Sequence, residues 1–468
     1  MRLKSKIEQK DLLFSNKDLW TLIWPLLIEQ LLQITLGIAD IIMVASLGES
    51  AVGGVSLVDQ INILLVNIFA ALATGGAVVC SQYIGRSNMK MAEKTARQLI
   101  YSVTAVAFII MGVCLVIRKP LLRLIFGSIE QDVMAASQKY FLITLLALPG
   151  IALYNAAASL FRAQGNSRIS MIVAALVNLL NIGGNAWLIY GMHCGVEGVA
   201  IPTLISRLIA AIILLVLLYR QKTSGKAVSI RGIFHFEWDW HLVGKILKIG
   251  VPNCLENSMF QFGKILVLSL VATFGTNAIA ANAAANTIAG FEVIPGAAVG
   301  MAMLTVVGQC MGAGKTEQAS YYTKKMLFIA IASMWVLNIP LLLSARWLLG
   351  FYHMSPQTTD MAWWMMFFHG FFGMLIWSFS FSLPNSLRAA GDATFTMIVS
   401  IISMWVFRVG MSYIFARTQI LGLVRFMNWD ECYGAVGTWL SMNIDWAVRS
   451  AFFIGRFAGG KWKNASVI

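Results

Sequence analysis

Two carboxylates lie in the first apolar stretch of the chain, Trp24–Gly48. Glu29 and Asp40 are eleven residues apart, so on a helix they face nearly the same direction, about 16 Å apart along the axis. Gln33 and Gly37 lie on or near that stripe. A carboxylate inside a membrane span costs about 2.5–3.5 kcal/mol. This face is therefore predicted to have a function, either as an ion site or as part of a cavity.

Asn181 and Asn185 form a second polar pair in an apolar stretch. Their spacing of four residues places both amides on one helical face. Amide oxygens suit a cation, whereas amide groups also join neighbouring membrane helices by hydrogen bonds. Both interpretations remain open from the residues alone.

Further charges fall inside the apolar segments of the second half of the chain. Glu256 is followed by Lys264, and Arg408 lies in a later segment. We expect Glu256 to be paired with Lys264 or Arg408, or to form with them a second functional site. Asp445 and Arg449 are four residues apart and are predicted to neutralise each other.

The composition predicts a helical membrane protein. Of 468 residues, 58% are hydrophobic and 12% are charged, against about 25% charged in soluble domains. The apolar runs are about 20 residues or longer, as helices rather than barrel strands require. The net charge of +14 is therefore read by its position in loops, and we expect lipid around the chain and no nucleic acid. Five scattered histidines and six unpaired cysteines indicate no metal centre, cofactor or enzyme active site.

The fold class is all-α, with twelve apolar segments and one long polar gap after the sixth. We therefore predict an amino-terminal lobe (1–220), a linker (221–245) and a carboxyl-terminal lobe (246–468). The predicted membrane segments are 19–46, 54–82, 99–117, 140–160, 169–190, 197–219, 246–273, 279–310, 326–349, 362–387, 394–416 and 434–456.

Lysine and arginine are unevenly shared between the two sides of such a bundle. Twelve spans return the chain to its starting side, which receives 24 of the 35 basic residues, including five in the amino-terminal tail. The opposite side receives 7, and 4 lie within helices. Positive charge accumulates on the cytoplasmic side, so both termini are predicted to be cytoplasmic, with no cleaved signal.

The two halves of the chain repeat one plan. Pro25-x-x-x-Glu29 recurs 227 residues later as Pro252-x-x-x-Glu256. Other matched pairs are Gln82–Gly85 with Gln309–Gly312, Arg162–Gly165 with Arg388–Gly391, and Gly195–Gly198 with Gly434–Gly437, the last displaced by about twelve extra residues near Gln419–Cys432. Six helices per repeat make the repeats parallel, as in several duplicated transporters.

With these motifs in place, the chain resembles the multidrug and toxic compound extrusion (MATE) family along its whole length. The resemblance rests on IADIIMVASLG, SQYIGRSNMKMAEKTARQ, GQCMGAGKTEQA, FRAQGNSR, SLRAAGD and NIDWAVRSAFFIGRFAGGKW, and on Asn181 and Asn185 followed by LIYG. The resemblance implies two six-helix lobes in a V around a cavity. It also implies export of small organic, often cationic, compounds by antiport with Na⁺ or H⁺, from a monomer in the bacterial cytoplasmic membrane.

The resemblance also assigns roles to particular residues. Asp40 takes the place of the family's cation-coupling aspartate, with Asn181 and Asn185 beside it, and Na⁺ would bind there transiently. Glu256 takes the place of a glutamate in the second-lobe ion site of some members. The acid that accompanies it there is missing, and Trp377 stands near that position. The repeat position of Asp40 is Val267, so the two lobes are predicted to differ in function.

Three other residues are cavity candidates, Glu29, Gln33 and Trp377. His369 is a lone histidine with a predicted structural role. Two rival functions remain: a flippase for lipid-linked precursors, which would line its cavity with several basic residues, and a membrane-embedded enzyme, which would need a catalytic cluster that the sequence lacks.

Overall fold

The computed structural model describes residues 12–127, 130–222, 227–417, 433–465 and 467–468. The basic amino-terminal tail and the loop of extra residues at Gln419–Cys432 fall outside or almost entirely outside these ranges. The chain divides into two compact units. The amino-terminal lobe contains Phe14–Cys254 and Gly308–Gly314, and the carboxyl-terminal lobe contains Leu255–Val307 and Lys315–Val467. The boundary falls inside a helix, α7, rather than in the loop before it.

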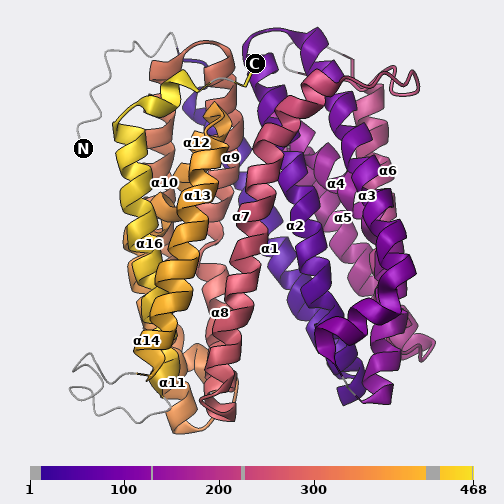
Figure 1. Ribbon diagram of the computed structural model, residues 1–468, viewed down its shortest axis with the longest axis vertical. Helices are drawn as coiled ribbons and strands as arrows, with labels where there is room; N and C mark the ends of the chain where they lie inside the picture. Colours follow the sequence, from indigo (N-terminus) through magenta and orange to yellow (C-terminus); the bar gives the residue numbers. More distant parts are fainter. Residues whose placement is uncertain (1–11, 128–129, 223–226, 418–432, 466) are drawn as a thin grey trace. The chain divides into compact units, whose positions relative to one another are not determined.

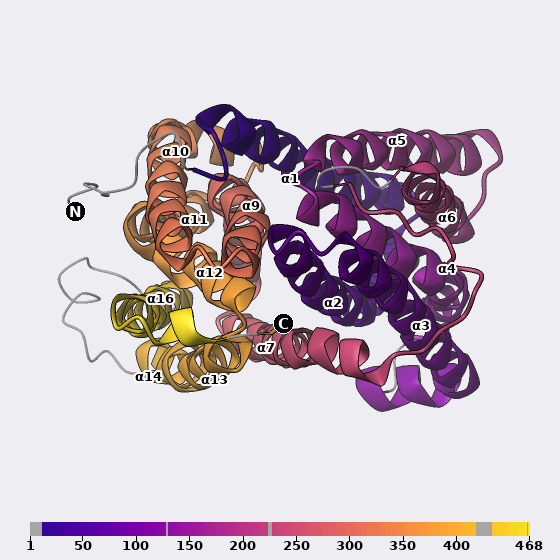
Figure 2. The ribbon, with the colours of Figure 1, turned by 90° about the horizontal axis from the view of Figure 1, so that it is seen from above.

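Six apolar segments build the amino-terminal lobe (Figure 1). Their helices are α1 (Asn16–Ala45), α2 (Glu49–Gly85), α3 (Met89–Phe126), α4 (Gln131–Ala163), α5 (Ser167–Ala186) with the π-helical turn η2 (Trp187–Gly191), and α6 (Glu197–Arg220). Side-chain hydroxyls join α2 to α4, because Ser159 Oγ donates to the carbonyl of Ala73 at 3.1 Å. Figure 2 shows α4 among its neighbours α2, α3 and α6, while α1 packs against α5.

The second set of helices repeats this plan with more interruptions. They are α7 (Trp240–Ala272), α8 (Thr276–Glu292), α9 (Ile294–Gly312), α10 (Thr316–Gly350), α11 (Pro356–Phe372), η3 (Gly373–Ser382), α12 (Leu383–Ala390), α13 (Ala393–Ser403), η4 (Met404–Gly410), α14 (Met411–Arg417), α16 (Gly434–Ala458) and the short η6 (Lys461–Asn464). Each of η3 and η4 is π-helical and continues directly into its neighbours. Segments of this kind occur frequently at functional sites.

The twelve-segment prediction agrees with this helix order, with one correction. The predicted segment 279–310 is two helices, because α8 ends at Glu292 and α9 begins at Ile294. Pro295 is the second residue of α9, a position that proline favours because its missing N–H costs nothing there. In the described part of the chain, eleven helices are long and apolar enough to cross a membrane, and α16 supplies the twelfth apolar segment.

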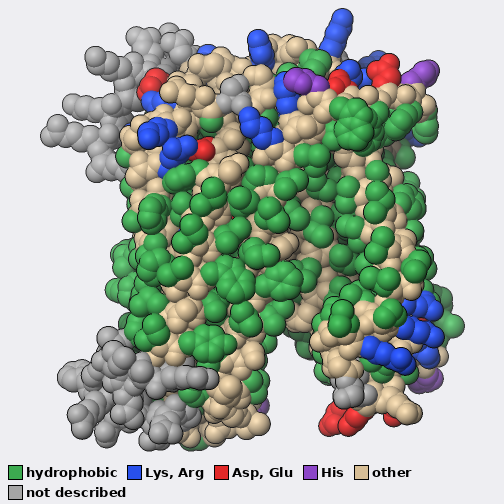
Figure 3. Space-filling view, viewed as in Figure 1, with side chains coloured by type: hydrophobic (Ala, Val, Ile, Leu, Met, Phe, Trp, Pro, Cys, Tyr) green, Lys and Arg blue, Asp and Glu red, His purple; other side chains and the backbone are tan. Residues whose placement is uncertain are grey.

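The surface agrees with a membrane setting. In Figure 3, hydrophobic side chains cover the middle of the visible face, and most charged side chains gather toward its ends. Exposed large apolar residues such as Ile41, Val116 and Leu343 belong to this covering. Such a surface suits hydrocarbon because it offers few groups that need water.

A repeated motif closes on itself at one end of the amino-terminal lobe. A Cβ atom on Gly85 would lie 2.0 Å from the carbonyl oxygen of Gln309, and one on Gly312 would lie 1.8 Å from that of Gln82. The two Gln-x-x-Gly motifs therefore pack crosswise, and both glycines are required by this close approach. The duplication in sequence is thus visible as a duplicated contact.

The predicted linker packs along α3. The Tyr101 hydroxyl donates to the carbonyl of Ile233 at 2.6 Å, and Lys94 forms an ion pair with Asp239 at 2.8 Å. That hydrogen bond to Lys94 is the main cause that lowers the pKa of Asp239. The linker is therefore part of the amino-terminal lobe.

Candidate ion site in the amino-terminal lobe

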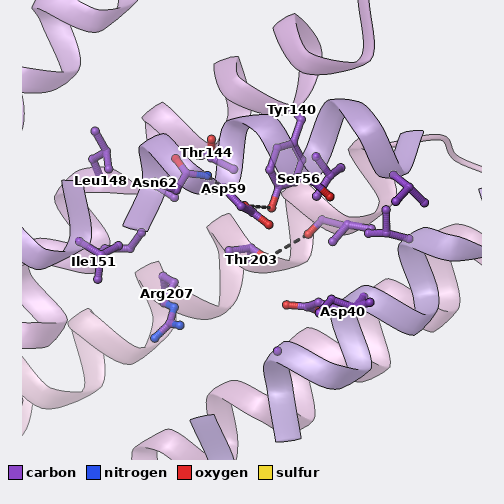
Figure 4. Close-up of a pocket in the computed structure, with 18 residues that line it drawn as sticks. Asp40, Ser56, Asp59, Asn62, Tyr140, Thr144, Leu148, Ile151, Thr203 and Arg207 are labelled. Atoms are coloured by element: carbon purple, nitrogen blue, oxygen red, sulfur yellow. Dashed lines mark hydrogen bonds between the residues drawn. The ribbon is translucent and has the colours of Figure 1, made fainter. Parts of the chain in front are cut away.

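A cavity of about 310 Å³ lies inside the amino-terminal lobe, between α1, α2, α4 and α6. Figure 4 shows its polar side chains, which come from four different helices. Those with charge or hydrogen-bonding groups are Asp40, Ser56, Asp59, Asn62, Tyr140, Thr144, Thr203 and Arg207. The remaining walls are mostly apolar. A polar space of this kind inside a membrane protein indicates a path or a binding site for ions.

Asp40 is joined to the two asparagines by a continuous chain of hydrogen bonds. Asn185 Nδ2 donates to Asp40 Oδ1 at 2.7 Å and lies 3.0 Å from Asn181 Oδ1. Asn181 Nδ2 in turn donates to Thr203 Oγ1 at 2.8 Å. The three residues proposed from sequence as the cation-coupling group are thus brought together, and Thr203 of α6 joins them.

The cavity has a second acid that sequence reasoning left unassigned. Asp59 Oδ1 accepts from the Tyr140 hydroxyl at 3.1 Å and from Asn62 Nδ2 at 3.4 Å. It lies close enough to Asp40 for the two carboxylates to repel each other. The available signal was an acidic residue in the second membrane span, which by itself indicates function. Nothing local in the sequence shows that Asp59 and Asp40 share a cavity.

The charges and oxygen atoms suit a small monovalent cation. Two carboxylates and Arg207 leave the cavity with one net negative charge when all three are ionised. Asn185 Oδ1 is buried and has no hydrogen-bond partner. Hard cations take oxygen ligands, so the Asp40 carboxylate and this free amide oxygen could hold Na⁺. The same carboxylate could instead accept a proton. No cluster of three or more His, Cys, Asp or Glu ligands occurs in the described chain.

Glu29 and Gln33, two cavity candidates, do not line this cavity. Glu29 is buried, accepts from Arg162 Nη1 at 2.8 Å and accepts from Ser170 Oγ at 2.9 Å. Gln33 is exposed. Gly37, from the same stripe, does line the cavity. The stripe thus divides between a salt bridge at one end and the cavity at the other.

Glu256 has a different partner from those predicted. Arg388 Nη2 lies 2.7 Å from Glu256 Oε1, and Arg449 Nη2 lies 3.5 Å from it. The expected pairs with Lys264 and Arg408 are not formed. Lys264 lies about 12 Å farther along α7, beyond contact. Glu256–Arg388 repeats Glu29–Arg162 in the other lobe, at offsets of 227 and 226.

Two other predictions for the carboxyl-terminal lobe need correction. Asp445 accepts from Ser403 Oγ at 2.6 Å and Arg449 donates to Ser400 Oγ at 2.9 Å, so these two residues do not form their own ion pair. His369 is not lone, because its Nδ1 contacts Glu292 Oε2 in the core of the lobe.

Trp377 is buried and stacks on Phe381, with ring centroids 4.9 Å apart.

The comparison with protein families gives a match to both halves of the chain. A family model described as MatE matches residues 25–187 and 252–414. The two ranges begin at Pro25 and Pro252, as the repeat requires. The duplication inferred from sequence motifs is thereby confirmed.

Relatives of similar length match nearly the whole chain. An "Uncharacterized transporter YisQ" from Bacillus subtilis is 28% identical, over 95% of this chain and 94% of that protein. A "Probable multidrug resistance protein NorM" from Thermotoga maritima is 24% identical, over 97% of this chain and 94% of that protein.

Solved structures share the fold. "Crystal structure of MATE in the bent conformation" superposes with a TM-score of 0.84 at 20% identity, covering 96% of this chain and 97% of that one. "Crystal structure of MATE in the straight conformation" gives 0.82 at 19% identity, covering 95% and 96%.

Proposed function

Since this chain belongs to the multidrug and toxic compound extrusion (MATE) family of membrane transporters, we propose that it exports small organic compounds in exchange for Na⁺ or H⁺. The observation that carries the proposal is the cavity in the amino-terminal lobe, where Asp40 meets Asp59, Thr203 and the Asn185–Asn181 chain. As a family member the chain is a transporter and not an enzyme.

The cation acts on the contact between α1 and α5. In the empty site, Asn185 of α5 donates a charge-assisted hydrogen bond to Asp40 of α1. Such bonds are roughly twice as strong as bonds between neutral groups. Na⁺ or a proton bound at Asp40 removes the negative charge and weakens this bond, so cation binding changes how firmly the two helices are joined.

Helix α1 is suited to respond to that change. Pro25 lies inside it and removes one backbone hydrogen bond. Movement of α1 and its lobe would then release the exported compound outward, and the cation-loaded protein would reset toward the cytoplasm. We place both termini in the cytoplasm and the monomer in the bacterial cytoplasmic membrane, from the distribution of basic residues.

Dye efflux from proteoliposomes tests the proposal, with Na⁺ and pH gradients imposed separately. We expect one gradient to drive efflux in the wild type, and Asp40→Asn to abolish gradient-driven efflux while leaving folding intact. Asp132→Asn is the matched control, because Asp132 is an exposed aspartate at the start of α4. Full efflux by Asp40→Asn would rule out Asp40 as the coupling residue, and ion flux without dye movement would indicate a channel.

A further inference from the structure

The carboxyl-terminal lobe contains a group of cationic side chains within its membrane-spanning helices. We call this group the basic cluster. It comprises Lys264 of α7, Arg388 of α12, Arg408 of η4 and Arg449 of α16. Two carboxylates, Glu256 and Asp445, lie among them, so two positive charges remain uncompensated when all six groups are ionised.

The hydrogen bonds leave part of the basic cluster without partners. Glu256 is shared by Arg388 and Arg449. Arg449 Nε and Nη1 have no hydrogen-bond partner, although the residue is only 2% exposed. In the described chain, Lys264 and Arg408 form no ion pair, although Lys264 is near enough to Arg408 to be repelled by it. Unpaired cations inside a membrane are costly and indicate a binding role.

The cluster occupies the repeat position of the ion site in the other lobe. In the two matched ranges, Asn181 corresponds to Arg408 and Gly37 corresponds to Lys264, both at an offset of 227. Asp40 corresponds to Val267. The place that attracts a cation in the amino-terminal lobe is therefore occupied by positive charge in the carboxyl-terminal lobe. A site of this charge attracts anions.

Aromatic rings connect the unpaired cations. Arg408 lies 5.1 Å from the ring centroid of Phe260, and Arg449 lies 4.5 Å from that of Phe381. The two phenylalanine rings are 6.2 Å apart, and Trp377 stacks on Phe381. Such an arrangement suits a flat ring that carries an acidic group, because the ring can stack while the acid meets the cations.

The site is reachable. Lys264 is exposed, and Arg408, Phe260 and Phe381 are partly exposed. We propose that the basic cluster binds the acidic group of an aromatic organic substrate through Lys264, Arg408 and Arg449. This rests on the proposed export function and specifies its substrate class: aromatic compounds with a carboxylate, including zwitterions, rather than purely cationic ones.

Binding of a matched pair of dyes tests the substrate class. The free-acid form of a rhodamine and its methyl ester share one ring system and differ in the carboxylate. Fluorescence polarisation with the purified full-length protein should give about tenfold or more tighter binding of the acid, since a hydrogen bond to a charged group supports that ratio. Equal affinities, or tighter binding of the ester, would overturn the proposal.

Variants locate the preference. Lys264→Met and Arg408→Met should each remove most of the tenfold difference, while Lys264→Arg should keep it. Lys324→Met is the control, because it removes an exposed lysine from α10 of the same lobe. An unchanged preference in both methionine variants would also overturn the proposal. Since Lys264 is exposed, its replacement does not disturb buried packing.

Two further arms separate this inference from neighbouring ones. Asp40→Asn should keep the preference for the acid, because binding needs no ion gradient, so a failure of cation coupling leaves this result readable. Farnesyl pyrophosphate tests a lipid-linked anion at the same cluster. If it displaces the dye at a tenfold lower concentration than the free acid does, the ligand is a lipid pyrophosphate and the small-acid assignment is wrong.

Discussion

The ion site of the amino-terminal lobe and the basic cluster of the carboxyl-terminal lobe stand on the same helix plan but carry opposite charge. The first joins Asp40 and Asp59 to one arginine, Arg207. The second leaves Lys264 and Arg408 unpaired in the described chain. Beside each site lies a π-helical turn, η2 in one lobe and η4 in the other. The repeat thus preserved a geometry and changed its chemistry.

What the lobes share identifies the scaffold. Glu29–Arg162 and Glu256–Arg388 are ion pairs of 2.8 and 2.7 Å at equivalent positions. Each ties the first helix of a repeat to the helix of the motif that ends in Gly165 or Gly391. A pair present in both lobes cannot account for a difference between them. The positions that differ, above all Asp40 and Arg408, are where the lobes acquired separate roles.

Breaking the shared ion pairs should have the largest effect. Arg162→Met and Arg388→Met each leave a buried carboxylate without its partner, which costs about 3–5 kcal/mol. We expect both variants to lower the thermal unfolding temperature in detergent by similar amounts. The double variants Glu29→Gln/Arg162→Met and Glu256→Gln/Arg388→Met should recover part of the loss. If Arg388→Met keeps full stability yet stops transport, Glu256 belongs to the transport chemistry instead.

An intermediate effect is expected where the lobes differ. Asn185→Ala removes the hydrogen bond to the Asp40 carboxylate, worth about 1.5–3 kcal/mol for a charged acceptor. The cation concentration for half-maximal efflux should shift by about tenfold or more. Ser412 is the repeat position of Asn185 and bonds only the carbonyl of Arg408, so Ser412→Ala should leave this concentration unchanged. Equal shifts in both variants would remove the proposed asymmetry.

The smallest effect should come from the linker, which only the amino-terminal lobe binds. Lys94 lowers the pKa of Asp239 below its ordinary value of 3.8. The ionised carboxylate is therefore favoured in the folded protein, and its contribution is present above pH 3.8 and is lost as the pH falls through the lowered pKa. Because the pair is partly exposed, Lys94→Met should cost less than about 1 kcal/mol at pH 7.

Thermal unfolding of wild type and Lys94→Met across pH checks this prediction. The difference between them should shrink steadily below pH 3.8. A difference that persists in acid would mean that Lys94 acts through packing of its side chain rather than through its charge.

The sequence by itself determined the helical class, the segment order, the duplication and the group around Asp40. Hydrophobic length and the spacing of Asn181 and Asn185 are local properties, and a helix converts local spacing directly into a shared face. The same reasoning identified Glu29 and Glu256 as twins.

Only the tertiary structure decided which distant groups meet. Asp59, Thr203 and Arg207 come from α2 and α6 and reach Asp40 across the cavity. Glu256 chose Arg388 over the nearer Lys264 because an ion pair needs contact in space, and residues two turns apart on one helix cannot make it. Partner choice among buried charges depends on helix packing, which no periodicity in the sequence records.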